Sequence, residues 1–344
     1  MRDPFVHAFT GGVDLGWEAG ERSWQHEAMA TPTVTEFTPE LTEVTSGLAF
    51  PEGPIWMPDG SVVLVEMFGP RLTRVHHDGT KETIAEIPGG PNGAAVGPDG
   101  AFYLCNNGGS FTPVDFGGMM LPTGGFDADH YLGGRIQRVD AHDGTITDLY
   151  TECDGHPLRG PNDLVMDGHG GFWFTDHGIR NEHARTADLT GIYYAQADGS
   201  GIVEGVFPTD SPNGIGMSPD ANTLYWAETH TGRVFQRSIT SPGEVAPSDL
   251  LDPGVLYGFP GYQFLDSLAI DGDGWVCVAT IFNGGITAIS PDGSQVEHYA
   301  TGDLLTTNIC FGGDDLRTAY VTCSSTGRLV SFPWPRPGLR LAHQ

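Results

Sequence analysis

Lysine is almost absent from this chain. Lys81 is the only one in 344 residues, and 16 lysine and arginine side chains together face 44 acidic ones, which gives a net charge of −28 at pH 7. Binding to nucleic-acid phosphates or to anionic membranes depends on lysine and arginine. We therefore expect neither nucleic acid nor an anionic membrane as a partner.

Long apolar runs and several catalytic fingerprints are also missing. No stretch reaches the roughly 18 apolar residues of a membrane span, and residues 1–30 lack the basic start and apolar core of a signal peptide. These features predict a soluble, cytoplasmic protein. The GxSxG, GxxxxGK[ST] and HExxH motifs are absent as well, so nucleophile-elbow, P-loop and zincin chemistry have no support.

Cysteine is scarce and has no pattern. The five cysteines are odd in number, widely spaced and free of CxxC or metal-ligand spacing; they are Cys105, Cys153, Cys277, Cys310 and Cys323. Most of them lie inside apolar, strand-like runs. They are predicted to be buried free thiols.

Turn residues, in contrast, are abundant and repeat at intervals. With 50 glycines, 25 prolines and many short alternating runs, the composition favours an all-β fold. One sequence pattern recurs six times. In each copy an acidic or amide residue begins a short apolar run, and a turn that contains an aspartate follows the run. The marked residues are Glu52, Asn92, Asn162, Asn213, Asp266 and Asn308. Self-similarity at this period is typical of stacked supersecondary units.

The pattern of each unit predicts four short antiparallel strands joined by hairpin turns. The first unit predicts strands at residues 53–57, 61–66, 71–76 and 81–87. Four such strands make one propeller blade, so the sequence predicts an all-β, six-bladed β-propeller with four-stranded antiparallel blades.

Closure of the ring requires a strand from the other end of the chain. The last unit supplies only three strands, and Leu41–Thr45 is available as the fourth. A ring closed by this N-terminal strand leaves no exposed sheet edge. The expected organisation is an irregular segment at residues 1–40, a propeller at 41–334 and a C-terminal tail at 335–344.

Two insertions interrupt the regular spacing. Asn106–Gly134, here called the first insertion, and His177–Thr190, the second insertion, both join a second strand to a third strand. Such loops emerge on the face where the innermost strands begin. They are therefore candidate walls over a central site.

The six marked side chains should converge on the ring axis. Glu52, Asn162, Asn213 and Asp266 would offer two charged and two neutral oxygens to a hard cation such as Ca²⁺, with positions left open. Asn92 and Asn308 could be outer ligands, hold water or line a substrate pocket. The alternative is that asparagine and aspartate after proline are turn formers, but turn preference does not explain the carboxylate of Glu52.

These motifs resemble the senescence-marker-protein/gluconolactonase/luciferin-regenerating (regucalcin-like) family. The resemblance rests on Glu52, Pro161-Asn162-Asp163, Pro212-Asn213-Gly214 and Asp266-Ser267 and covers roughly Leu41–Trp334. It implies a six-bladed propeller with calcium or another divalent ion in the central channel, and hydrolysis of a lactone. It also implies that Glu52, Asn213 and Asp266 are direct ligands, and that Asn162 is a ligand or holds substrate and a water.

Two alternatives remain open at this level. Diisopropyl-fluorophosphatase-like propellers share the same Glu, Asn, Asn, Asp ring, so the motif does not separate lactone from phosphotriester hydrolysis. A propeller used only for binding, with a structural ion, is the third possibility. Two features also depart from the family: Arg159 lies three residues before Asn162 instead of two, and the first insertion has no counterpart in the shorter members.

The interpretation adopted is a calcium-dependent lactonase acting on a small cyclic ester, with Zn²⁺, Mn²⁺ or Mg²⁺ as other possible ions. Asp266 is the first choice for the base that activates water, and His177 is the second. The predicted substrate-binding residues are Asn92, Arg159, Asn162, His230, Tyr262 and Asn308. The sequence does not predict an oligomeric state.

Overall fold

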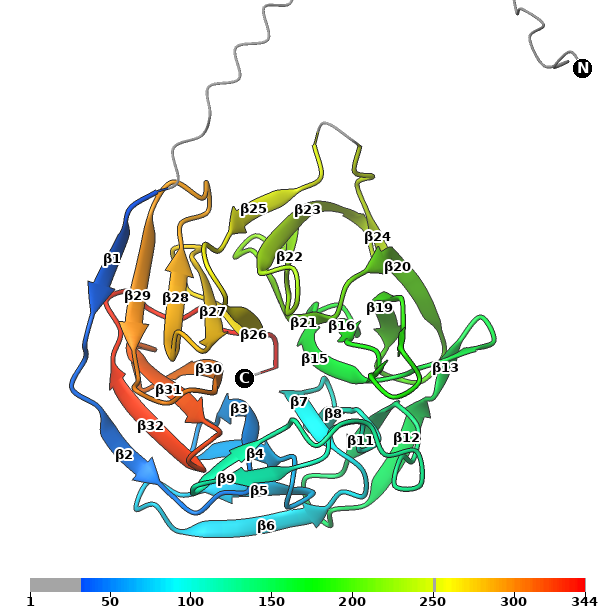
Figure 1. Ribbon diagram of the computed structural model, residues 1–344, viewed down its shortest axis with the longest axis horizontal. Coiled ribbons are helices and arrows are strands. Elements are labelled where there is room, and N and C mark those ends of the chain that lie inside the picture. Colours follow the sequence, from blue (N-terminus) through cyan, green and yellow to red (C-terminus); the bar gives the residue numbers. More distant parts are fainter. Residues whose placement is uncertain (1–31, 250–251, 344) are drawn as a thin grey trace, which may run out of the picture. The chain divides into compact units, whose positions relative to one another are not determined.

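The computed structural model of this protein has six β-sheets arranged around a central axis (Figure 1). The structure describes residues 32–249 and 252–343, so the predictions made for residues 1–30 lie outside the described residues. Within these ranges every regular element is a strand, and no helix is long and apolar enough to cross a membrane. The prediction of a six-bladed β-propeller is confirmed.

The blades follow one another along the chain, each running from the axis outward. Blade 1 contains β3 (Pro51–Trp56), β4 (Val62–Glu66), β5 (Arg71–Val75) and β6 (Lys81–Glu86); blade 2 contains β7 (Pro91–Val96), β8 (Phe102–Asn106), β11 (Arg135–Val139) and β12 (Ile146–Tyr150). Blade 3 contains β15 (Pro161–Met166), β16 (Gly171–Asp176), β19 (Thr190–Gln196) and β20 (Ile202–Thr209). A short β-pair, β13 (Glu152–Cys153) with β14 (His156–Pro157), links blades 2 and 3.

The second half of the ring repeats this order. Blade 4 contains β21 (Pro212–Met217), β22 (Thr223–Glu228), β23 (Arg233–Ser241) and β25 (Val255–Gly258), with the short β24 (Glu244–Val245) on the end of β23. Blade 5 contains β26 (Phe264–Ile270), β27 (Val276–Ile281), β28 (Gly285–Ile289) and β29 (Val296–Ala300); blade 6 contains β30 (Thr306–Gly312), β31 (Thr318–Cys323) and β32 (Arg328–Pro333).

The chain's N-terminal strand closes the ring. β2 (Thr42–Thr45) pairs antiparallel with β32 and completes blade 6, as predicted for Leu41–Thr45. A second strand, β1 (Val34–Phe37), pairs parallel with β29 and gives blade 5 a fifth strand. Residues 34–37 thus form regular structure inside the segment that was expected to be irregular.

Burial falls from the axis to the rim of each blade. In blade 1, β4 is buried along its whole length, whereas most residues of the outermost strand β6 are exposed. The inner strands are covered on both faces because neighbouring blades pack against them, and their sequences are accordingly apolar without strict alternation. The position of a strand in the blade therefore determines how apolar it is.

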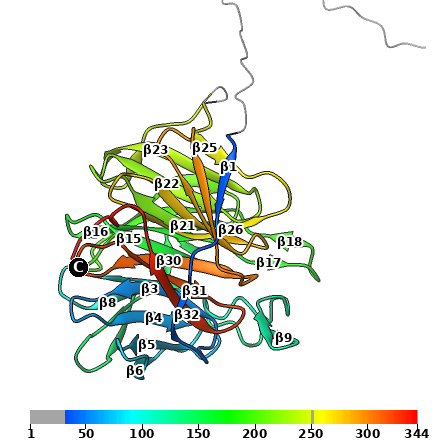
Figure 2. The same ribbon diagram turned by 90° about the vertical axis from the view of Figure 1, so that its left-hand side faces the viewer.

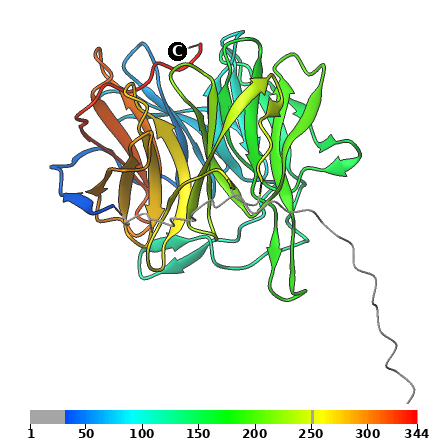
Figure 3. The same cartoon turned by 90° about the horizontal axis from the view of Figure 1, so that it is seen from above.

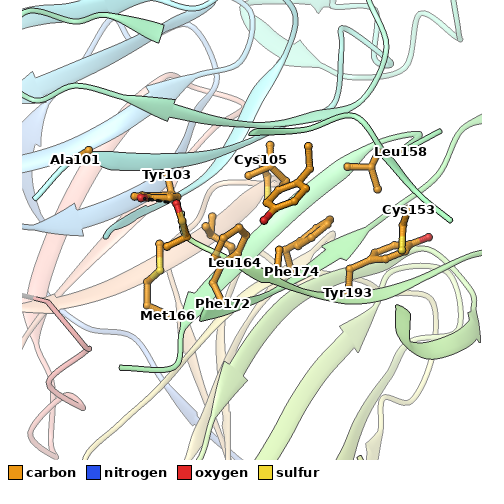
Figure 4. Close-up of a cluster of buried hydrophobic side chains, with 14 residues drawn as sticks. Ala101, Tyr103, Cys105, Cys153, Leu158, Leu164, Met166, Phe172, Phe174 and Tyr193 are labelled. Atoms are coloured by element: carbon orange, nitrogen blue, oxygen red, sulfur yellow. Dashed lines mark hydrogen bonds between the residues drawn. The ribbon is translucent and has the colours of Figure 1, made fainter. Parts of the chain in front are cut away.

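Aromatic and sulfur side chains fill the space between the blades. Between blades 2 and 3, Tyr103 packs edge-on against Phe172, and Phe174 stacks on Tyr193 (Figure 4). Cys105 lies in the same cluster, and all five cysteines are buried and free, which confirms the prediction of buried thiols.

Both insertions lie on one face of the ring, here called the loop face. Pairing of Pro91 with Asn106 and of Pro161 with Asp176 places the start of each insertion beside the start of an innermost strand, as predicted. The first insertion forms a hairpin of β9 (Val114–Phe116) and β10 (Met119–Leu121); the second forms β17 (Arg180–Asn181) and β18 (Thr186–Ala187). The C-terminal tail lies on the opposite face (Figures 2 and 3).

Candidate active site

Six oxygen-bearing side chains face the axis near the start of the innermost strands, and we call them the oxygen ring. All six are at least 92% buried, with exposed fractions between 2% and 8%. They are Glu52 in β3, Asn92 in β7, Asn162 in β15, Asn213 in β21, Asp266 in β26 and Asn308 in β30. One comes from each blade, so the structure brings together all six residues marked by the sequence repeat.

Hydrogen bonds at the ring join neighbouring blades. The Asn308 amide nitrogen donates to a Glu52 carboxylate oxygen at 3.4 Å, and the hydroxyl of Ser267, beside Asp266, donates to Asn213 Oδ1 at the same distance. At Gly93, a Cβ atom would lie 2.5 Å from the carbonyl oxygen of Asn162. Glycine is required there because the innermost strands of neighbouring blades approach each other backbone to backbone.

A break in strand pairing occurs at the ring position or directly beside it in every blade. In blades 1 to 5 two residues of the innermost strand lack a partner, for example between Glu52 and Ile55 and between Pro212 and Ile215, and blade 6 has a shift between Thr306 and Asn308. Such bulges bend a strand and redirect a side chain, and they are frequent next to active sites. The bulge is therefore part of what turns each ring side chain to the axis.

Buried polar side chains at the ends of the second strands support the ring from outside. Asp176 accepts hydrogen bonds from the backbone N–H groups of Arg159 and Gly160, both at 2.7 Å. Glu66, Asn106 and Glu228 do the same for the turns before their own innermost strands. Sequence reasoning missed these four residues, although each occupies the last position of a second strand.

The carboxylates on the axis are poorly compensated. Burial, and then the Asp266 and Asp163 carboxylates, raise the pKa of Glu52 well above its usual range. Burial raises the pKa of both Asp163 and Asp266 to about 7. Among the ion pairs formed by the described residues, none involves these three carboxylates. Buried negative charge without a partner is costly, and a cation would remove that cost.

The amide oxygens of the ring point to the same conclusion. Within the described ranges, Asn92 Oδ1 and Asn162 Oδ1 are buried and have no hydrogen-bond partner. In the same ranges, no group of three or more His, Cys, Asp or Glu side chains is arranged to hold a metal. An ion here would thus need amide oxygens in addition to Glu52 and Asp266, and a mixed set of carboxylate and amide oxygens suits calcium.

His177 and His230 lie next to each other on the loop face. His177 directly follows β16 and is 7% exposed, and its ring centroid is 5.9 Å from that of the exposed His230. Burial and the neighbouring His230 lower the pKa of His177 to about 4. The imidazole of His177 is therefore neutral at neutral pH, a form that can accept a proton.

Arg159 and Tyr262, which also have a predicted substrate role, contact side chains of the surrounding loops. The Arg159 guanidinium pairs with Asp188 of the second insertion at 2.8 Å and lies 5.7 Å from the ring of Tyr131 in the first insertion. Arg159 thereby connects the two insertions. Tyr262 is 72% exposed and stacks on Phe282 at the edge of the loop face.

The C-terminal tail closes the far end of the central channel. A cavity of about 70 Å³ continues from the oxygen ring away from the loop face, and Leu339 and Leu341 form part of its wall. Backbone hydrogen bonds from Leu339 to Ile270 and from Gly272 to Pro337 hold the tail across the inner strands, and in Figure 1 the tail runs to the middle of the ring. The tail therefore covers the side of the site that lies opposite the loop face.

Comparison of the sequence with known protein families identifies the family of this chain. A family model for the SMP-30/gluconolactonase/LRE-like region matches residues 50–325, which is most of the propeller. The chain belongs to this family. The resemblance expected from the sequence motifs is thereby confirmed.

Curated proteins similar to this chain are named lactonases. The chain is 28% identical to lactonase drp35 of Staphylococcus epidermidis over 252 residues, which cover 72% of this chain and 66% of that protein, just under two thirds of its length. It is 29% identical to lactonase drp35 of Staphylococcus saprophyticus over 293 residues, which cover 82% and 79% of the two chains.

Several solved structures share the fold. A gluconolactonase from Xanthomonas campestris superposes with a TM-score of 0.67 at 21% identity, covering 90% of this chain and 93% of the other. A calcium-binding regucalcin from Agrobacterium tumefaciens has a TM-score of 0.66 at 20% identity, covering 90% and 99%. At such low identity the likeness shows a common six-bladed fold.

Asp163 is a feature of this family member that the sequence interpretation did not single out. It follows Asn162 directly, at the position where blades 1, 2 and 4 have Gly53, Gly93 and Gly214. Its side chain lines the central channel and accepts a hydrogen bond from its neighbour's N–H. A carboxylate at a position where the equivalent blades need glycine was the signal that could have identified it.

Proposed function

We propose that this protein is a lactone hydrolase whose oxygen ring binds a divalent cation, with calcium as the first candidate. Glu52, Asn162, Asn213 and Asp266 would hold the ion, and Asn92 and Asn308 would complete its surroundings or contact substrate. When bound, the ion would act as a Lewis acid that polarises the ester carbonyl. The lactonase names of the curated relatives support the choice of substrate class.

A single observation carries the metal part of the proposal. Glu52, Asp163 and Asp266 are buried together without an ion-pair partner in the described ranges, beside amide oxygens of Asn92 and Asn162 that no donor satisfies. A purely structural ring would be expected to satisfy these groups internally, because unsatisfied buried polar atoms are rare. A hard cation satisfies both the charge and the oxygens.

The remaining roles follow from position. Asp266 is the proposed base that takes a proton from the attacking water, because its buried carboxylate lies in the innermost strand β26 at the oxygen ring. His177 is the alternative base, since it is neutral and lies on the loop face. The backbone around Asn162 is fixed by Asp176, so a substrate carbonyl at the ring would meet preorganised groups.

Arg159, His230 and Tyr262 are proposed to act at the edge of the site. The exposed His230 and Tyr262 are connected through Phe264, whose ring contacts both. Arg159 contacts both insertions and would affect substrate binding through their position.

One assay tests the proposed function against its alternatives. The purified protein is given a panel of lactones and one organophosphate triester, with and without a chelator, and its metal content is measured by elemental analysis. Lactone hydrolysis that is lost with chelator and restored by Ca²⁺ is the expected result. Full activity without metal would contradict the metal role. Turnover of the triester alone would favour a phosphotriesterase. Bound metal without any turnover would favour a propeller that only binds.

A further inference from the structure

The loop face carries six side chains next to the oxygen ring, four of them apolar and two of them imidazoles, and we call them the apolar collar. Each blade or its insertion contributes one residue to it: Met67, Phe111, His177, His230, Phe264 and Leu305. Met67 and Leu305 are buried in one apolar cluster, and Phe111 packs against them. Ring contacts continue the collar from Phe111 to His177 at 5.7 Å, and from His230 to Phe264 at 5.1 Å.

A cavity of about 390 Å³ opens next to this collar, between the rim of blade 1 and the first insertion. Its apolar wall consists of Met67, Phe68, Pro70, Phe111, Pro113 and Leu132. A volume of this size lies within the range of small-molecule sites. The cavity is thus large enough to receive part of a ligand.

Two side chains show that the cavity adjoins the oxygen ring. Met67 Sδ lies 3.8 Å from the amide nitrogen of Asn92, a ring member. Phe111, which also lines the cavity, packs edge-on against His177. A molecule with its reacting group at the ring could therefore extend a substituent past Met67 and Phe111 into this cavity.

The polar groups of the cavity wall are largely engaged with each other. Asn107 Oδ1 already accepts hydrogen bonds from the N–H groups of Gly109 and Ser110. His130 Nδ1 lies 2.7 Å from Asp127 Oδ2, within hydrogen-bond distance. A ligand hydroxyl buried here would lose its water partners without full replacement, which is unfavourable, whereas an apolar group would gain from leaving water.

We propose that this cavity is a subsite for an apolar substituent, so that the preferred substrates are alkyl- or aryl-substituted lactones and not polyhydroxylated sugar lactones. The inference rests on the proposed function, because it assigns the substrate class of the same site. It adds that the first insertion, through Phe111 and Leu132, selects the substrate.

The first test compares three lactones that differ in substituent. The value of kcat/KM should be at least about tenfold higher for δ-decalactone than for δ-valerolactone, and glucono-δ-lactone should be the poorest of the three. Leu132→Asp, which places a charge in the cavity wall, should reduce the preference for the alkyl chain at least several-fold. Leu189→Asp is the matched control, because Leu189 is an exposed leucine of the second insertion, away from the cavity.

A binding measurement separates this inference from the proposed function. The lactam analogue of δ-decalactone, which resists hydrolysis, should bind by calorimetry, and Leu132→Asp should weaken its binding while Leu189→Asp should not. If the lactam binds in this way but no lactone is hydrolysed, the subsite stands and the proposed function is wrong. If lactones are hydrolysed but glucono-δ-lactone is preferred, or if the two aspartate variants behave alike, the subsite is wrong and the proposed function stands.

Discussion

The amide of Asn308 lies 3.4 Å from the carboxylate of Glu52, although 256 positions separate the two residues in the sequence. This contact joins the first blade to the last one at the oxygen ring. The two side chains differ in one decisive property: Glu52 brings a negative charge to the axis and Asn308 does not. They should therefore respond very differently to substitution.

Glu52→Gln should weaken calcium binding about a hundredfold or more, because it removes one of the negative charges of the proposed calcium site. Asn308→Ala should weaken it less than about tenfold, since it removes a neutral neighbour. Calcium affinity by calorimetry and the rate of lactone hydrolysis are the measurements. Similar losses in the two variants would mean that the six ring positions are structural equivalents.

Stability should depend on pH through His177, whose pKa is lowered to about 4 by burial from an ordinary value of 6.5. The unfolded chain takes up this proton between pH 6.5 and pH 4 and the folded protein does not, so the folded state loses up to about 3 kcal/mol as the pH falls through this range. Above pH 6.5 the residue has no such effect.

His177→Gln should accordingly flatten the dependence of urea-unfolding free energy on pH between these limits. The groups around His177 in the wild type, His230, Arg180 and Asp210, remain in the variant. His183→Gln, an exposed position in the same insertion, is the control and should leave the curve unchanged. Parallel curves for the wild type and His177→Gln would show that His177 takes up its proton as readily in the folded protein as in the unfolded chain.

The C-terminal tail should contribute to stability through Arg336. Its guanidinium bonds the fully buried Asp271 at 2.5 Å and Glu297 at 2.9 Å, and lies 4.0 Å from the ring centroid of Trp275. Arg336→Met leaves the Asp271 charge buried without its partner, which should reduce the unfolding free energy by about 3 kcal/mol.

The matched control is Arg180→Met, which breaks an ion pair with Asp210 whose two side chains are 41% and 48% exposed. Exposed pairs contribute roughly 0–1 kcal/mol. Urea denaturation of both variants provides the comparison. Equal and small effects would mean that the tail does not depend on Arg336 for its position across the channel.

The cysteines should be unreactive in the native protein. Burial raises the pKa of Cys310 and Cys323 to about 12, and that of Cys105 well above its usual range. The thiolate is the reactive form, so Ellman's reagent should titrate less than about one thiol per native chain and all five after denaturation. Rapid labelling of several thiols without denaturant would indicate that the blades open readily.

Local patterns in the sequence determined the architecture and the members of the oxygen ring. The turn after each innermost strand repeats at a recognisable period, so the blades, the closing strand at Thr42–Thr45 and the two insertions could be located without coordinates. Glu52, Asn162, Asn213 and Asp266 were found because each occupies the same place in its unit. Because the unit repeats, the place of a residue within its unit predicts where that residue lies in the ring.

Other features became visible only in the tertiary structure, because they depend on contacts between segments that share no local signal. The parallel pairing of β1 with β29, the tail across the channel, and the link that Arg159 forms between the insertions all join distant parts of the chain. The apolar collar is likewise assembled from residues of all six blades. A sequence repeat specifies what each blade contains, but side-chain contacts between blades arise only when the ring closes and the inner strands pack together.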